Sequence, residues 1–296
     1  MRLQKLVRKL PAIIALTPAA AIVLVVYIGC AIWSIRVSMT SSRLIPNDNF
    51  VGVRQYEVLF DNERWQVSVL NLVLFGALFV ITALALGFLL AILLDQRVRG
   101  ENTLRSLFLY PYSMSFVVTG LVWHWLLDPT YGIQKTGRDL GFSTFTFDWI
   151  VDQRLVIYTL VVAAIWHAAG LVMAIALSGL RGIDAEIWKA ARIDGIPTWR
   201  TYTSIVLPML GGSLATAAIL LTLSVVRLYD LVVAMTKGGP GLASEVPAKF
   251  IVDHLFERGN IGLATAASTV MLITVLAVVA PWVYVQNMRK TARGTA

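Results

Sequence analysis

The chain has 296 residues, of which 57% are hydrophobic and only 14% are charged, and its formal net charge is +8. Soluble domains carry about 25% charged residues, so this composition excludes an ordinary soluble protein and predicts an integral membrane protein. The single cysteine, Cys30, excludes an internal disulfide framework. The lysines and arginines lie between apolar segments, which indicates membrane topology rather than a nucleic-acid-binding surface.

Six apolar windows contain no Asp, Glu, Lys or Arg, and each is at least 22 residues long: 11–35, 67–94, 106–127, 155–180, 204–226 and 262–286. At about 1.5 Å per residue, a helix of this length covers the roughly 30 Å hydrocarbon core of a bilayer. The sequence therefore predicts an all-α membrane protein with six transmembrane helices.

An even number of spans places both termini on one side of the membrane. The segments on that side are 1–10, 95–105, 181–203 and 287–296; they hold 14 Lys and Arg in 54 residues, whereas the loops on the other side hold 11 in 93. Because positively charged loops stay in the cytoplasm, we expect both termini and 181–203 to be cytoplasmic. We interpret window 11–35 as a retained anchor, since the apolar run of a cleaved signal peptide is only about 7–15 residues long.

The second and third windows carry packing signals. Gly76, Ala83, Gly87 and Ala91 are small residues that let helices approach closely in lipid, so we expect window 67–94 to pack centrally. We expect Pro111, near the start of the third window, to bend that helix.

The third and fourth windows each contain a tryptophan followed by a histidine, Trp123–His124 and Trp166–His167. A polar group inside a membrane normally faces the bundle interior or a water-filled path. One interpretation is that these four residues line a sugar route, since aromatic rings suit the apolar faces of pyranoses and imidazoles bond hydroxyls. The other is that the tryptophans lie at the interface and each histidine bonds a neighbouring helix.

The fifth window and the residues after it contain Ser224, Arg227, Tyr229 and Asp230. If the helix continues past the window, Arg227 and Asp230 lie about one turn apart and can pair. Charge in the outer half of a membrane is costly and usually functional. These four residues are therefore candidates for a substrate path, and a structural ion pair is the alternative.

Residues 186–208 form the longest polar-rich segment on the expected cytoplasmic side. Asp184 is a candidate N-cap, and Glu186 in the first turn suits the helix dipole. We expect Gly195 and Pro197 to end this helix and a second helix to run from Thr198 into the fifth window. One face of the first helix is small and mixed, which suits docking into a groove of another protein. That face contains Ile183, Ile187, Ala190, Ala191 and Asp194.

This segment resembles the signature loop of the type I ABC importer permeases, which reads roughly Glu-Ala-Ala, three residues, Gly, nine residues and Ile-x-Leu-Pro. Lys189 occupies the usual glutamate position, so if that glutamate pairs with a cation on the ATPase, this chain must use a different contact. The residues that match the pattern are Ala190, Ala191, Gly195, Ile205, Leu207 and Pro208.

Two other stretches resemble the carbohydrate branch of that family. The first is the entry segment with Gly52, Gln55, Tyr56 and Asn71, in which Gln55 replaces the usual asparagine. The second is Thr236–Pro240, which we expect to be a rigid turn rather than a phosphate-binding loop, because consecutive glycines allow positive φ and proline ends a helix.

The resemblance implies a MetI-like fold. Residues 1–66 would hold the first helix and an entry loop, 67–287 the transmembrane domain with a coupling loop at 184–208, and 288–296 a cytoplasmic tail. The residues expected to contact the ATPase are Glu186, Lys189, Ala190, Ala191, Asp194, Gly195, Leu207 and Pro208.

The resemblance also implies a role. The chain would be a permease of an ATP-driven, binding-protein-dependent importer in the bacterial inner membrane, similar to maltose-type or alpha-glucoside-type first permeases. Its cargo would be a sugar or a polyol. The implied partners are a second homologous permease, two ABC ATPase subunits that bind ATP-Mg, a periplasmic or lipid-anchored solute-binding protein, and membrane lipid.

Several sequence patterns are absent. The chain has no G-x-x-x-x-G-K-[ST] loop for ATP, no cysteine and histidine cluster with zinc spacing, and no Ser-His-Asp arrangement. We therefore expect no bound cofactor and no catalysis by this chain. The alternatives are a secondary transporter or channel, and an integral membrane enzyme. A secondary transporter would need coupling carboxylates within its spans, and the six windows contain none.

Overall fold

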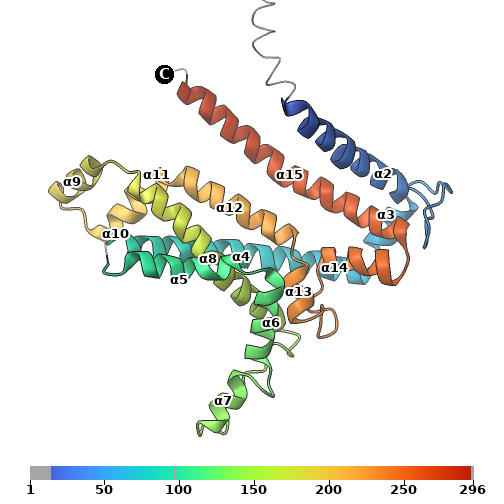
Figure 1. Cartoon of the computed structure of the whole chain (residues 1–296), viewed down its shortest axis with the longest axis horizontal. Coiled ribbons are helices and arrows are strands. Elements are labelled where there is room, and N and C mark those ends of the chain that lie inside the picture. Colours follow the sequence, from blue (N-terminus) through green and yellow to red (C-terminus); the bar gives the residue numbers. More distant parts are fainter. Residues whose placement is uncertain (1–14, 97, 295–296) are drawn as a thin grey trace, which may run out of the picture. The chain divides into compact units, whose positions relative to one another are not determined.

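The computed structural model describes residues 15–96 and 98–294, and in this part of the chain every regular element is a helix, apart from two isolated β-bridges. These residues divide into two compact units: the first consists of the described parts of 1–63 and 250–296, and the second of the described parts of 64–249. The all-helical class predicted from the sequence is confirmed (Figure 1). The elements are η1 (Val23–Ile28), α2 (Gly29–Ser38), α3 (Arg54–Phe60), α4 (Glu63–Asp95), α5 (Glu101–Ser113), α6 (Phe116–Leu127), α7 (Ile133–Asp139), α8 (Val156–Arg181), α9 (Ala185–Ile193), α10 (Thr198–Arg200), η2 (Thr201–Val206), α11 (Leu207–Met209), α12 (Gly211–Val226), α13 (Asp230–Met235), α14 (Pro247–Val252), η3 (Asp253–Glu257) and α15 (Ile261–Gly294).

The predicted windows fall on helices wherever the structure describes them, and residues 11–14 of the first window lie outside the described residues. The number of spans differs from the prediction. Within 15–96 and 98–294, three helices are long and apolar enough to cross a membrane: Ala15–Ser38, α4 and α8. Two further windows fall on bent helix pairs, so there are up to five spans if each pair is counted as one. The sixth window falls on α15, whose described apolar part is Ile261–Ala277. The count of six and the cytoplasmic side of the termini stay predictions.

In the first unit, α2 and α3 pack against α15 (Figure 1). The entry segment holds the connection after α2 in place. The Gln55 side chain donates to the Thr40 carbonyl at 2.9 Å, and the Tyr56 hydroxyl lies 2.6 Å from Ser38 Oγ. The two residues that resemble the family's entry motif therefore have a structural role in this unit.

In the second unit, α8 is the central helix. Of the most apolar part of α8, 67% is buried, compared with 28% for α4. α4 buries one face, with a buried residue at almost every fourth position, and this face contributes to both hydrophobic clusters of the unit. The prediction that window 67–94 packs centrally is therefore confirmed for this face of α4. That face contains Phe75, Phe79, Ala83, Gly87 and Ala91.

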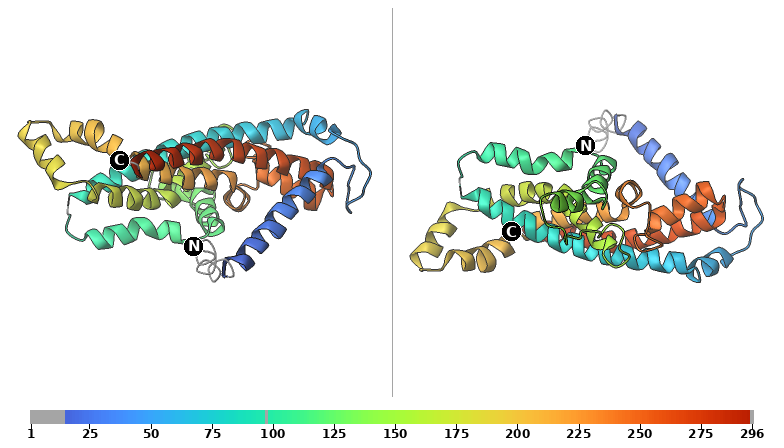
Figure 2. Two further views of the ribbon diagram at one scale, coloured as in Figure 1. Left: turned by 90° about the horizontal axis from the view of Figure 1, so that it is seen from above. Right: turned by 90° about the horizontal axis from the view of Figure 1, so that it is seen from below.

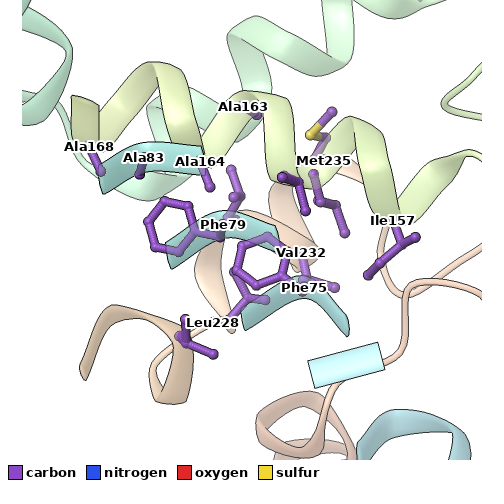
Figure 3. Close-up of a cluster of buried hydrophobic side chains, with 14 of the residues drawn as sticks. Phe75, Phe79, Ala83, Ile157, Ala163, Ala164, Ala168, Leu228, Val232 and Met235 are labelled. Atoms are coloured by element: carbon purple, nitrogen blue, oxygen red, sulfur yellow. The ribbon is translucent and has the colours of Figure 1, made fainter. Parts of the chain in front are cut away.

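The core of the second unit lies where α4, α8 and α13 meet. In Figure 3, Phe75 and Phe79 of α4 lie between the alanines of α8 and Val232 of α13, and their rings stack 5.5 Å apart. Figure 1 shows α5 and α12 running beside α8. This bundle forms a fixed base for the segments that connect its helices.

The third window is bent by 98° between α5 and α6, but not where the sequence predicted. Pro111 lies near the end of α5 rather than at a helix start. The break occurs at Met114, whose backbone is extended, and Ser115 then caps α6 by accepting a hydrogen bond from the Val118 N–H at 3.3 Å. The bend is therefore set by a new helix cap and not by the proline.

Gly170 permits the closest approach between α5 and α8, because an added Cβ would collide with the Phe108 carbonyl of α5. We expect Gly170→Ala to destabilise the protein by about 1–3 kcal/mol, the usual cost of overpacking, since the obstacle is backbone. The matched control is Gly211→Ala in α12, where an added Cβ meets nothing within 4 Å. Thermal unfolding of the purified variants should show a lowered midpoint for Gly170→Ala alone, and equal midpoints would contradict this packing.

Candidate functional site

The segment 184–208, here called the coupling loop, projects beyond the ends of α4, α5 and α8 (Figures 1 and 2). Asp184 caps its first helix, α9, by accepting a hydrogen bond from the Glu186 N–H at 3.0 Å. After α9, Gly195 adopts φ +66°, and its N–H donates to the Arg192 carbonyl. The Ile196 N–H donates to the Ala191 carbonyl, which completes a Schellman cap. The predicted start and end of this helix are confirmed.

The predicted docking face of α9 is partly wrong. Ala191 is 4% exposed, so it is turned toward the rest of the chain, while Ile187 and Trp188 are half-buried on the same side. The opposite side of α9 and the residue after it are exposed, and Ile193 is 85% exposed. A docking partner would therefore meet Glu186, Lys189, Ala190, Ile193 and Asp194.

Three contacts hold the base of the coupling loop. The Trp188 ring of α9 packs edge-on against the Tyr202 ring of η2 at 5.3 Å, and Gln96 at the end of α4 donates to the Tyr202 hydroxyl at 3.0 Å. Arg181 at the end of α8 forms a 2.6 Å ion pair with Glu101 at the start of α5. Movement of α9 would therefore be transmitted to α4, α5 and α8.

The second helix of the loop does not run straight into the fifth window. Leu207 and Pro208 belong to the short helix α11 and are exposed. A 73° bend then separates residues 198–209 from α12, and Leu210 lies at the break. The continuous helix expected from Thr198 is therefore a bent pair.

The structure brings the two tryptophans of the candidate path together and gives each histidine a structural partner. Trp123 of α6 and Trp166 of α8 pack edge to face, with their ring centroids 6.0 Å apart. His124 Nδ1 donates to the Met235 carbonyl of α13 at 2.7 Å. His167 is 3% exposed; its Nδ1 lies 3.1 Å from Thr119 Oγ1, and its ring stacks on that of Phe116. Both histidines therefore bond a neighbouring helix, as the second interpretation expected.

A structural ion pair, the alternative interpretation of Arg227 and Asp230, is not formed. α12 ends at Val226, and α13 begins at Asp230, so Arg227 and Asp230 are not on one continuous helix. Both side chains are exposed, and no ion pair joins them, while Tyr229 is half-buried. The helical spacing argument fails because the chain turns at 227–229. Ser224, on the last turn of α12, bonds the Leu220 carbonyl of its own helix.

The Thr236–Pro240 segment is a turn, as predicted. Lys237 and Gly238 have positive φ, and the Gly239–Pro240 peptide is cis. Thr236 Oγ1 lies 2.8 Å from Ser244 Oγ, which donates to the Gly239 carbonyl. Side-chain hydrogen bonds therefore close this turn without any ligand.

The sequence analysis missed a buried charged cluster beside this turn. Glu245 is 2% exposed, and its Oε1 accepts hydrogen bonds from Arg64 Nε at 3.0 Å and Nη2 at 2.7 Å, while Lys249 Nζ lies 3.9 Å from Oε2. Asn71 of α4 donates to the Leu242 and Glu245 carbonyls. The signal in the sequence was an acidic residue shortly after a turn that resembles a family motif. Its basic partner lies 181 residues earlier, beyond the reach of local patterns.

Asp128 shapes the turn that follows α6. Its Oδ1 accepts hydrogen bonds from the N–H groups of Thr130 at 2.7 Å and Tyr131 at 3.2 Å. These bonds, that from Thr130 first, favour the charged carboxylate and lower the pKa of Asp128 below its ordinary value. The turn places α7 beside the end of α6, where an apolar cavity of about 740 Å³ lies between them. Such a lining offers few partners for sugar hydroxyls.

A metal centre is not built by the residues that the structure describes, because no three His, Cys, Asp or Glu side chains gather there. Three features remain as candidates for a functional site. They are a capped loop linked to three long helices, a tryptophan pair, and a break between α12 and α13.

Comparisons with known proteins extend these observations. A family model described as "Binding-protein-dependent transport system inner membrane component" matches residues 83–291. A probable ABC transporter permease protein of Pyrococcus horikoshii is 36% identical over 274 residues, which cover 92% of this chain and 94% of that protein. The xylose/arabinose import permease protein of Haloferax volcanii is 28% identical over 243 residues, which cover 81% of this chain and 76% of that protein.

A solved structure has a similar fold. It is the crystal structure of a bacterial ABC transporter involved in the import of the acidic polysaccharide alginate. One of its chains aligns with a TM-score of 0.80 and 15% identity, and the alignment covers 98% of this chain and 99% of that one. At this identity the likeness concerns the fold alone.

Proposed function

This chain belongs to the family of binding-protein-dependent transport system inner membrane components, and on that premise we propose that it is a permease subunit of an ATP-driven importer of a sugar or polyol. The helices would form half of a translocation path in the cytoplasmic membrane, and a second, homologous permease would form the other half. Two ATPase subunits inside the cell would bind ATP-Mg, and a solute-binding protein outside would deliver the cargo. The chain itself would bind no cofactor and catalyse no reaction.

The observation that carries this proposal is the geometry of the coupling loop. A helix capped at both ends presents one exposed face, while its buried face contacts η2. An ATPase that holds Lys189 and Ile193 could therefore pull on α4 and α8 when it closes around ATP. Because Lys189 replaces an acidic residue of the family pattern, we propose that the ATPase surface facing it is acidic or offers carbonyl oxygens.

Support for sugar as the cargo comes from the relatives and from the aromatic residues. The Haloferax relative is named as an importer of xylose and arabinose. In this chain, Trp123 and Trp166 form an aromatic pair that suits a pyranose face. We propose that this pair and the break between α12 and α13, with Ser224, Arg227, Tyr229 and Asp230, line the path. His124 and His167 would then position the path helices.

Affinity purification from the native membrane tests the proposed assembly. Tagged protein should retain two copies of an ABC ATPase and one homologous permease. A secondary transporter or a membrane enzyme would require neither. Isolation of this chain alone from mild detergent, with its transport activity intact, would reject the proposal.

Substitutions on the proposed path should affect recognition before they affect folding. We expect Arg227→Ala to raise the KM for sugar uptake about tenfold, because an exposed guanidinium at a helix break can bond sugar hydroxyls. We expect His124→Ala to lower the maximal rate, since its bond to α13 is lost. Arg154→Ala, at an exposed site before α8, is the control. Normal kinetics and specificity in both variants would remove Arg227 from the path and would show that His124 does not position its helices.

A further inference from the structure

A second cavity, here called the loop cavity, lies beneath the coupling loop and has a volume of about 1150 Å³. Its walls are the end of α4, the start of α5, the end of α8, and α9 with the first residues of the next helix. All of these segments belong to the second unit. The cavity is therefore bounded by α9, which the ATPase is proposed to move, and by the helices α4, α5 and α8, to which that movement would be transmitted.

Apart from the Arg181–Glu101 ion pair, the described lining of the loop cavity carries more positive than negative side chains. Arg181 is neutralised by Glu101 at 2.6 Å. Lys189 and Arg192, one turn apart on α9, also line the cavity, and neither forms an ion pair within the described residues. Asp95 in the opposite wall is the remaining acidic group. Among the lining residues that the structure describes, two cations on α9 and one carboxylate at the end of α4 therefore remain.

The remaining lining suits a hydroxylated group. Trp188 supplies an aromatic surface, and Thr198 supplies a hydroxyl. Gln96 and Thr201 already donate hydrogen bonds within the chain, to Tyr202 and to the Pro197 carbonyl, and their side-chain oxygens can accept further ones. Lys and Arg close together bind phosphate through charge-assisted hydrogen bonds, whereas a carboxylate accepts hydrogen bonds from hydroxyls. The lining therefore combines groups for a phosphate on one wall with groups for hydroxyls on the other.

We infer that the loop cavity binds a hydroxylated phosphate ester, with the phosphate on Lys189 and Arg192 and the hydroxyls toward Asp95 and Gln96. This inference rests on the proposed function only in that the coupling loop faces the cytoplasm. Two sources share this chemistry there. One is a free sugar phosphate, and the other is the glycerol headgroup of phosphatidylglycerol in the inner leaflet. A bound ester would connect α9 to α4, and because Lys189 is also a proposed ATPase contact, the ester and the ATPase would compete for this side chain.

Two binding measurements on the purified full-length chain in detergent distinguish the sources. Calorimetric titration with glucose 6-phosphate, compared with glucose, tests the free ester. Native mass spectrometry with phosphatidylglycerol, compared with phosphatidylcholine, tests the lipid. Neither measurement needs the ATPase, so a failure here is separate from a failure of the proposed assembly.

Variants of Arg192 locate the site. We expect Arg192→Gln to weaken binding of the favoured ester about tenfold and Arg192→Lys to restore it to within about threefold. Arg200→Gln is the control, because Arg200 is an exposed cation of the same loop outside the cavity lining. If Arg192→Gln does not fold, Lys189→Gln, which changes an exposed side chain, takes its place with the same expected loss.

Two outcomes would overturn the inference. The first is that neither ester binds more tightly than its control compound. The second is that the variant in the cavity and Arg200→Gln weaken binding equally, which would mean a diffuse attraction by the loop's charge instead of a built site.

Discussion

Replacing Gly195 by proline is expected to reduce ATP-driven uptake at least tenfold. Gly195 has φ +66°, whereas proline fixes φ near about −65°, and the Gly195 N–H that donates to the Arg192 carbonyl would be lost. The end of α9 would unwind, and the surface offered to the ATPase would lose its shape. Uptake of labelled sugar by cells, together with the amount of ATPase that copurifies, measures this effect.

Gly195→Asn is the matched control for the proline variant. An added Cβ at this position meets nothing within 4 Å, and asparagine tolerates the left-handed conformation. This variant should therefore retain most of the uptake and ATPase binding. Unchanged uptake in Gly195→Pro would show that the Schellman cap does not matter for coupling.

Replacing Glu245 by glutamine should cause a larger loss of stability than Gly170→Ala. The glutamine keeps the size of the side chain, but Arg64 and Lys249, both only 14% exposed, would then face a neutral amide in place of a carboxylate. Removing one partner from a buried ion pair typically costs about 3–5 kcal/mol. Thermal unfolding in detergent should show a midpoint lowered by several degrees or more, with reduced expression.

An exposed ion pair provides the control for Glu245→Gln. Lys135 and Asp139 are 3.1 Å apart on α7, and their side chains are 54% and 65% exposed. Asp139→Asn should change the free energy of unfolding by less than about 1 kcal/mol, because water screens such pairs. If both variants unfold at the same temperature as the parent protein, the cluster around Glu245 does not hold the turn to α4.

Local chemistry made the ends of α9 predictable. An aspartate that accepts a backbone N–H starts this helix, and a glycine with positive φ ends it; both signals lie within a few residues of the boundary. The turn at 236–240 is predictable for the same reason, because its glycines and proline are local signals. Apolar length likewise located the helices, since a long charge-free stretch has few other stable conformations in a membrane.

Features set by distant contacts could not be predicted. Which side of α9 is buried depends on Tyr202, so the pattern of small residues assigned Ala191 to the wrong face. The bend after α5 occurs at Met114, although Pro111 carries the stronger local signal. The break at 227–229 separates Arg227 from Asp230, although their spacing alone permits a helical pair.

The two histidines show the same difference between what local sequence predicts and what distant contacts decide. Sequence identified His124 and His167 as polar groups within apolar helices. Only the fold shows that one bonds the Met235 carbonyl and the other lies beside Thr119. A polar residue in a membrane helix therefore needs a hydrogen-bond partner. Only its neighbours in the fold show whether that partner is the transported solute or another helix.

Transport in proteoliposomes tests the central claim most directly. The chain would be reconstituted with its companion permease, with and without the ATPase subunits and internal ATP, and sugar accumulation would be measured. We predict accumulation only when the ATPase, ATP and the solute-binding protein are all present. Cargo movement by this chain alone, without nucleotide, would contradict the account.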